Sequence, residues 1–210
     1  MQPNMRIFLE ERRRVLAALA GVAGSLMLPG VARAEGPVGK VGLISGRATA
    51  VRNSLDVALE KGSELEIGDL VKTDIRTIVE LLLGRRTTIR LGESAELLID
   101  SFVMNMRGRF DLMQGAMFFD RPADEPKSDV LIRTVFGQLG VRGTRFFAGP
   151  NRGVFAVFVE RGAVAVAAGG ETVTLGPGDG VNIPEPGAPP EDVVQWGQGR
   201  IDEVYASVGL

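Results

Sequence analysis

Short runs of alternating apolar and polar residues occupy most of this chain from Val38 onward. Side chains of successive residues in a β-strand point to opposite faces, so this alternation is typical of strands that bury one side. Glycine and polar residues, which favour tight turns, separate the runs. The pattern predicts an all-β single domain of short strands, built as a β-sandwich or roll or as an irregular β-solenoid, with a short C-terminal helix.

The alternating runs give the positions of the expected strands, and two glycine-containing segments are expected to interrupt them. Gly140 is expected to break the chain ahead of Arg145, and Glu160–Gly162 is expected to form a hairpin turn. The runs expected to be strands are Val38–Ile44, Ala48–Arg52, Leu70–Lys72, Thr77–Leu83, Thr87–Leu91, Ala95–Asp100, Arg109–Leu112, Ala116–Asp120, Asp129–Thr134, Arg145–Ala148, Val154–Val159, Ala163–Ala168, Glu171–Leu175 and Val181–Ile183.

Two sequence phrases recur along the chain. In the first, a polar residue and a glycine precede an alternating run, at Gly46, Gly115 and Gly162. In the second, a glycine-aspartate pair begins three residues after a leucine, at Gly68-Asp69 and Gly178-Asp179. Glycine admits the positive φ of a tight turn, and an aspartate carboxylate can accept backbone N–H bonds within it. We therefore expect structural turns at both pairs and a β-unit that is repeated with variation; a coincidence of common hairpin signals is the alternative.

Residues 1–34 have the composition of a cleaved export signal. Arg6 and Arg12-Arg13-Arg14 give a positive start, Val15–Leu28 is apolar, and Ala32-Arg33-Ala34 has small residues where a signal peptidase cuts. The apolar stretch reaches roughly 21 Å as a helix, short of the ~30 Å hydrocarbon core of a membrane. Glu35 is therefore the expected mature N-terminus, with no membrane span after cleavage. The consecutive arginines also resemble a twin-arginine signal, so both this route and the general secretory route stay open.

The chain contains no Cys and no His among its 210 residues. It therefore has no disulfide, and it lacks the commonest metal ligand and the usual proton shuttle near neutral pH. Paired acids such as Glu64 and Glu66, or Asp100 and Asp111, lack the context of a catalytic cleft. The sequence predicts no enzyme, no catalytic residue, no metal site and no cofactor; a glycan-cleaving enzyme is the minority alternative.

Net charge restricts the partners of the chain. Removal of residues 1–34 takes away five Arg and two Glu, which changes the formal net charge from −2 to −5. Affinity for nucleic acid rests on Lys and Arg contacts to phosphates, so we expect no nucleic-acid binding.

The β domain is expected over residues 35–184, followed by a proline-rich linker and a helical tail over 185–210. Pro184–Pro190 is rich in proline, and Glu191 and Asp192 are acidic residues of the kind favoured at a helix start. Trp196 and Tyr205 belong to a loosely helical apolar stripe. Packing of this stripe against one end of the β domain is favoured over a partner-binding tail, because Trp and Tyr are more often packing anchors.

Two arginine-containing turns supply the candidate partner-binding residues: Arg142, Thr144 and Arg145 around Gly143, and the pair Arg85-Arg86. A planar guanidinium is suited to recognition of carboxylate or phosphate groups. The competing interpretation is structural. Gly143 permits a turn, Thr144 hydrogen-bonds across it, and charged residues on strand edges prevent edge-to-edge pairing.

Several separated phrases, taken in order, resemble the FecR domain. The segment Val141–Phe146 is the core of this likeness, which extends from about Val38 to Ile183 and includes Leu59–Thr73 and Val79–Leu91. The resemblance implies an all-β module that Gram-negative bacteria place in the periplasm, where it relays receptor occupancy by protein–protein contact. The implied partner is another envelope protein, a receptor or a membrane sensor, and we expect the chain to act as a monomer. Some family members carry a cytoplasmic anti-sigma segment that is not recognisable here, so the resemblance does not extend to direct control of a sigma factor.

A second hypothesis is a small-molecule or glycan-binding domain. Glu171–Pro184 resembles the second half of a cupin motif, although a metal cupin needs a histidine cluster that this chain lacks. The hypothesis predicts a pocket lined by aromatic residues, for which the candidates are Phe102, Phe110, Phe118, Phe119 and Trp196.

Overall fold

The computed structural model describes residues 36–103, 107–122, 124 and 129–210, and the expected export signal lies outside them. The described residues form one 16-stranded sheet and one α-helix, which confirms the all-β prediction. The elements are β1 (Gly39–Ser45), β2 (Ala48–Arg52), β3 (Leu55–Ala58), β4 (Glu64–Leu65), β5 (Leu70–Thr73), β6 (Ile78–Leu83), β7 (Thr87–Leu91), β8 (Glu96–Val103), β9 (Arg107–Gln114), β10 (Met117–Asp120), β11 (Asp129–Thr134), β12 (Gln138–Asn151), β13 (Val154–Ala168), β14 (Glu171–Leu175), β15 (Asp179–Ile183), β16 (Val194–Gln195) and α2 (Gln198–Ser207).

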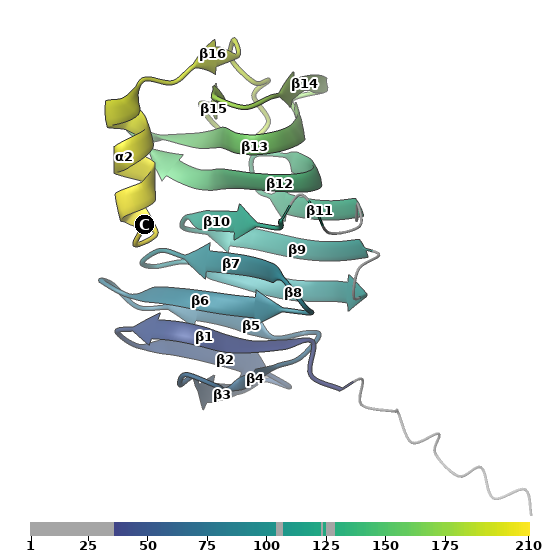
Figure 1. The fold of residues 1–210 in the computed structure, drawn as a ribbon, viewed down its shortest axis with the longest axis vertical. Coiled ribbons are helices and arrows are strands. Elements are labelled where there is room, and N and C mark those ends of the chain that lie inside the picture. Colours follow the sequence, from purple (N-terminus) through teal and green to yellow (C-terminus); the bar gives the residue numbers. More distant parts are fainter. Residues whose placement is uncertain (1–35, 104–106, 123, 125–128) are drawn as a thin grey trace, which may run out of the picture. The chain divides into compact units, whose positions relative to one another are not determined.

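The sheet is curled, so that two groups of strands face each other (Figure 1). Along the hydrogen-bonded path, β3, β2, β5, β8, β9 and β11 come before β12, and β10, β7, β6, β1 and β4 come after it. We call the first group the back layer and the second the front layer. The long strands β12 and β13 belong to both layers, because each bends midway: β12 pairs first with β11 and then with β10, and β13 pairs first with β15 and then with β14.

The recurring polar-glycine phrase marks the places where the chain crosses between the layers. Gly46 connects β1 of the front layer to β2 of the back layer, and Gly115 connects β9 of the back layer to β10 of the front layer. Gly162 lies at the bend of β13. Their φ angles are +105°, +78° and +88°, a backbone region that glycine adopts without a steric penalty. The repeated phrase is therefore a repeated corner.

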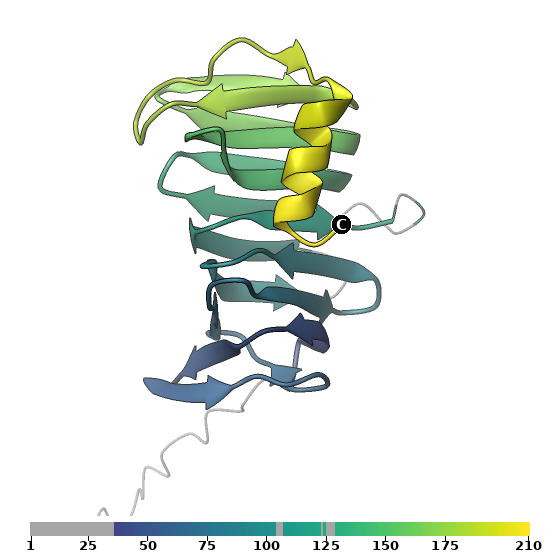
Figure 2. The same cartoon turned by 90° about the vertical axis from the view of Figure 1, so that its left-hand side faces the viewer.

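The main core lies between the layers, and a second apolar cluster lies on the outer side of the front layer under α2. Alternation places inward side chains of β6 and β7, such as Leu81 and Ile89, in the main core. Phe146 also lies in the main core, whereas its neighbour Phe147 belongs to the outer cluster with Val204 of α2. Both faces of the front layer are thus buried in this region. Figure 2 shows α2 lying across these strands.

Two expectations about chain breaks are wrong. Gly140 lies inside β12 and pairs with Leu131, and Glu160–Gly162 is not a hairpin, because β13 continues through it. A bend inside a long strand keeps the backbone hydrogen bonds of both layers, whereas a hairpin would reverse the chain. Apolar and polar residues alternate on both sides of each glycine whether the strand bends or the chain reverses, so the local sequence pattern does not distinguish a bend from a hairpin. Strand β3 was also missed from the alternation, and all four of its residues are exposed.

The C-terminal segment packs on the β layers. Pro190 is buried, and the backbone N–H of Glu191 donates to the carbonyl of Asn182 at 2.9 Å. The helix begins at Gln198, later than the acidic pair at 191 and 192 indicated, because Val194–Gln195 pairs with β15 as a short strand. Trp196 is only 8% exposed and stacks on Phe158.

Candidate functional site

The segment Arg142–Arg145 is the bend at which β12 passes from the back layer to the front layer. Arg145 pairs with Asp120 of β10, and the register against β13 shifts between Arg142 and Arg145. Gly143 has a φ of +60°. The residues that the sequence offered as a partner-binding turn therefore also shape the fold at this point.

The bend of β13 lies directly against the bend of β12. A Cβ atom on Gly162 would lie 2.6 Å from Cγ2 of Thr144 and 2.7 Å from the carbonyl oxygen of Gly143. Thr144 is fully buried at this contact, and its hydroxyl makes no hydrogen bond within the described part of the chain. The expected hydrogen bond of Thr144 across the turn is therefore absent there, and its side chain serves to pack the corner.

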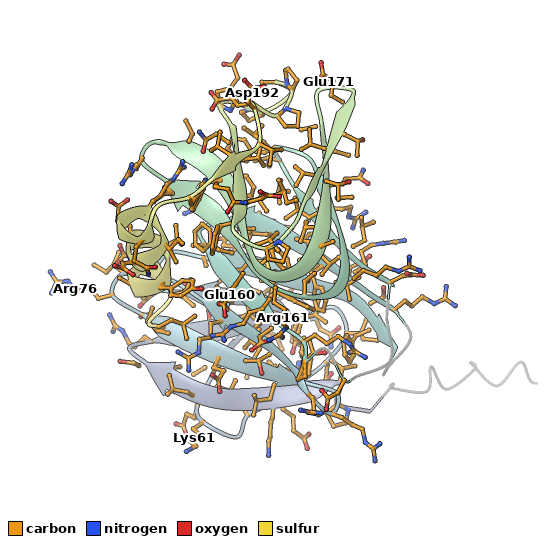
Figure 3. All side chains as sticks on the ribbon, turned by 45° about the horizontal axis from the view of Figure 1, so that its top comes forward. Lys61, Arg76, Glu160, Arg161, Glu171 and Asp192 are labelled. Atoms are coloured by element: carbon orange, nitrogen blue, oxygen red, sulfur yellow. The ribbon has the colours of Figure 1, made fainter. Side chains whose placement is uncertain are left out.

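A network of charged side chains surrounds the corner on the outer surface. Nη2 of Arg161 donates to Oδ1 of Asp120 at 2.9 Å and to the carbonyl of Arg121 at 3.0 Å. Arg145 contacts two acids, with Nε 3.6 Å from Oδ2 of Asp120 and Nη1 3.2 Å from Oε1 of Glu160. These side chains are half-buried, and Figure 3 shows Glu160 and Arg161 next to each other on the bend. Pairs of this exposure are worth at most about 1 kcal/mol each, so the network mainly fixes side-chain positions.

Tyr205 connects this network to α2. Its hydroxyl donates a hydrogen bond to Oε2 of Glu160. Burial is the main cause that raises the pKa of Tyr205 above its usual range, and the hydrogen bond and negative charge of Glu160 raise it further. The Tyr205 ring also meets Phe118 edge to face at 5.4 Å, and the guanidinium of Arg145 lies 5.2 Å from the centroid of Phe118. We call Asp120, Arg145, Glu160, Arg161 and Tyr205 the corner network.

The second arginine turn comes close to the same corner. Arg85 and Arg86 are exposed between β6 and β7, and Nη1 of Arg86 lies 2.6 Å from Oδ2 of Asp124. The hydrogen bond from Arg86 is the main cause that lowers the pKa of Asp124, and the positive charge of Arg161 also lowers it. Arg86 and Arg161, which are distant in the sequence, thus both act on the carboxylate of Asp124. Arg142 is exposed at the bend itself.

The two glycine-aspartate pairs form the same turn. The backbone N–H of Glu66 donates to Oδ2 of Asp69 at 2.8 Å, and the N–H of Gly176 donates to Oδ2 of Asp179 at 2.7 Å. The glycine before each aspartate, Gly68 or Gly178, has a φ near +90°, with values of +91° and +86°.

The second oxygens of the two aspartates have different partners. Asp69 is fully buried, and both its oxygens accept from Arg52 at 2.7 Å, whereas Oδ1 of Asp179 accepts from Gln195. Both carboxylates are thus occupied in structural contacts.

The aromatic pocket expected for a small-molecule or glycan-binding domain is not formed by the candidate residues. Phe102, Phe110 and Phe119 lie in the main core, and Phe118 and Trp196 lie in the outer cluster. Each is at most 8% exposed. These five residues therefore do not line an open pocket, because three of them pack between the layers and two pack in the outer cluster.

Sequence reasoning missed most of the corner network. The sequence pattern places Asp120 at the end of a strand, Glu160 and Arg161 in a hairpin, and Tyr205 in a packing stripe. A usable signal was present for two of these residues, since Asp120 and Glu160 each directly follow a strongly apolar run. Their convergence depends on strand pairing, which that signal does not give.

Within the described residues, no group of three or more Asp, Glu, His or Cys side chains is placed to hold a metal ion. Among the helices that the structure describes, none has the length and apolarity needed to cross a membrane.

The bend at Arg142–Arg145 lies within an all-β fold, and residues 69–165, which include it, match the family model described as FecR protein. This match confirms the resemblance to the FecR domain that the sequence indicated. The match covers the bend of β12 and most of the corner network, and it ends within β13.

Solved structures show the same fold. Two crystal structures of a candidate anti-sigma factor from Parabacteroides distasonis ATCC 8503, at 1.65 Å and 2.50 Å resolution, superpose with TM-scores of 0.54 and 0.53 at 15% sequence identity. Each comparison covers 63% of this chain and 62% of the other, so the chain spans less than two thirds of the proteins that it resembles. A comparison with curated proteins gave no significant match.

Proposed function

We propose that this chain is an exported regulatory domain that binds another envelope protein, a receptor or a membrane sensor, and transmits a signal by that contact without catalysis. The observation that carries the proposal is the FecR match across the corner at which β12 and β13 bend. The export signal read from residues 1–34 supports a periplasmic location.

The exposed arginines at the corner are the proposed contact residues. Arg85 and Arg142 are exposed to solvent. Arg145 is half-buried and forms ion pairs with Asp120 and Glu160. An acidic surface on the partner would meet planar donors held on a rigid bend, which favours specific recognition over general attraction. The similarity to a candidate anti-sigma factor is consistent with a regulatory role.

Affinity capture from an envelope extract tests the proposal. The immobilised protein is expected to retain a saturable envelope protein, and Arg142→Glu or Arg85→Glu should reduce that retention several-fold. Arg76→Glu is the matched control, because Arg76 is exposed and Figure 3 places it away from the corner. Retention that does not saturate, or that all three variants reduce equally, would contradict the proposal.

The proposed location has a separate test. Cell fractionation followed by mass spectrometry of the purified protein should find it in the periplasm with Glu35 as its first residue. A cytoplasmic protein that begins at Met1 would exclude the export part of the proposal.

A further inference from the structure

Strand β3 is an uncovered sheet edge at one end of the back layer. Among the described strands it pairs with β2 alone. All four of its residues are exposed, and Leu55 and Val57 are 69% and 39% exposed. Edges of this kind present backbone donors and acceptors that can pair with another chain.

The register shows which backbone groups face outward. The N–H of Leu59 donates to the carbonyl of Ala48 at 2.9 Å, so these two residues form a hydrogen-bonded pair. Hydrogen-bonded and non-hydrogen-bonded pairs alternate along an antiparallel ladder. The pairs of Val51 with Asp56 and of Thr49 with Ala58 are therefore non-hydrogen-bonded. It follows that the N–H and C=O groups of Asp56 and Ala58 point away from β2, toward the edge.

The apolar side chains of β3 lie on its core-facing side. Leu55, Val57 and Leu59 alternate along one face, and Leu59 is buried in the main core. The row of apolar side chains that begins with buried Leu59 thus continues to Val57 and Leu55, which the described residues leave exposed. An added strand would extend the sheet and bring its own apolar residues beside Leu55 and Val57.

At the opposite end of the molecule, the sheet is covered by other segments of the chain. There the proline-rich segment passes so close to the β13–β14 turn that a Cβ on Gly169 would overlap Ala188 and Pro189. The chain also adds β16 beside β15 and lays α2 across the front layer. These elements cover the C-terminal end, and within the described residues no comparable element lies beyond β3.

The charges around β3 indicate what kind of strand would fit. Exposed acids follow in sequence at Asp56, Glu60 and Glu64, with Lys61 as the exposed base among them. Two copies of this chain would bring two acidic edges together, which disfavours pairing of β3 with itself. A basic segment would be attracted.

We infer that the β3 edge binds an extended segment of a protein partner, in which apolar residues alternate with Lys or Arg, by adding it as a strand to the back layer. Pairing of a peptide backbone with an exposed edge is an established mode of recognition. This surface is separate from the arginine corner, so it can be tested whether or not the corner binds a partner.

A synthetic eight-residue peptide of alternating valine and lysine serves as the probe for the purified protein. We expect saturable binding and slowed hydrogen exchange of the Asp56 and Ala58 amides. Asp56→Lys should weaken binding about fivefold, since it replaces an attractive cross-strand pair by a repulsive one. Asp192→Lys is the matched control, because Asp192 is exposed, changes the net charge equally and lies at the end opposite Lys61 in Figure 3.

A second variant tests the backbone contact. Ala58→Pro removes an outward N–H without removing a bond to β2, and it should weaken binding about tenfold while the protein keeps its β-sheet circular dichroism. The inference is overturned if the peptide does not bind saturably, or if an alternating valine-glutamate peptide binds equally well. Equal effects of Asp56→Lys and Asp192→Lys, or a dimer of the protein that pairs through β3, would also overturn it.

Discussion

Gly162 shows how a single residue supports the corner. Its φ is positive, and a Cβ there would press on Thr144 and on the Gly143 carbonyl. Gly153 also has a positive φ, of +85°, but a Cβ there would meet nothing within 4 Å. Comparison of the two positions therefore distinguishes the cost of backbone strain, which a side chain meets at both, from the cost of close contact, which it meets at Gly162 alone.

We predict that Gly162→Ala lowers the free energy of unfolding by about 2–4 kcal/mol, from left-handed strain and crowding together. Gly153→Ala should lower it by only about 1 kcal/mol, from strain alone. Urea unfolding of both variants measures the difference. Equal losses would show that the two bends do not press on each other.

Residue types at the turns could be read from the sequence, but their partners could not. The glycine-aspartate phrase indicated a carboxylate that accepts backbone N–H bonds, and Asp69 and Asp179 do so. The bond from Arg52 to Asp69 was not foreseeable, because it depends on the lateral pairing of β2 with β5.

Helix α2 is held by its contacts and not by its own sequence. Gly197 at its N-cap makes no side-chain capping bond, and neither acidic residues in the first turn nor basic residues in the last turn support it. A helix of 10 residues is marginal by itself in water. Its position therefore depends on contacts such as those of Tyr205 with Glu160 and of Glu203 with Arg152.

We predict an abnormal alkaline titration for Tyr205, the single tyrosine of the chain. The pKa of Tyr205 is raised in the folded protein above the unfolded value of 10.0. Protonated Tyr205 therefore stabilises the docked helix fully at pH values below 10.0, and this stabilisation is lost as the pH rises from the unfolded pKa through the folded pKa. The phenolate absorbance of the folded protein should stay low at pH values where the protein in concentrated urea titrates with a midpoint near 10.

The same measurement on Glu160→Gln provides the control for Tyr205, because this change removes the negative charge and keeps an acceptor. The titration midpoint should move downward but stay above that of the unfolded chain, since burial is the larger cause. A normal titration in the folded wild-type protein would show that α2 is not docked as described.

Over the whole molecule, the two layers share strands and should unfold together. β12 and β13 are each part of both layers, and α2 lies across the front layer. We predict that the fluorescence of Trp196, the single tryptophan, and the far-ultraviolet circular dichroism give coincident urea transitions. Two separate transitions would mean that the C-terminal segment detaches before the sheet unfolds.

The sequence alone determined the class of fold, most strand positions, the turn glycines and the FecR resemblance, because period-two alternation and turn chemistry are local properties. It did not determine that the chain bends within β12 and β13 instead of reversing. Only the tertiary structure decided which strands are neighbours, and it thereby brought Asp120, Glu160 and Tyr205 to one corner and left β3 at an edge. Strand pairing joins residues that are distant in the chain, and the alternating pattern of a strand is the same whichever neighbour it pairs with.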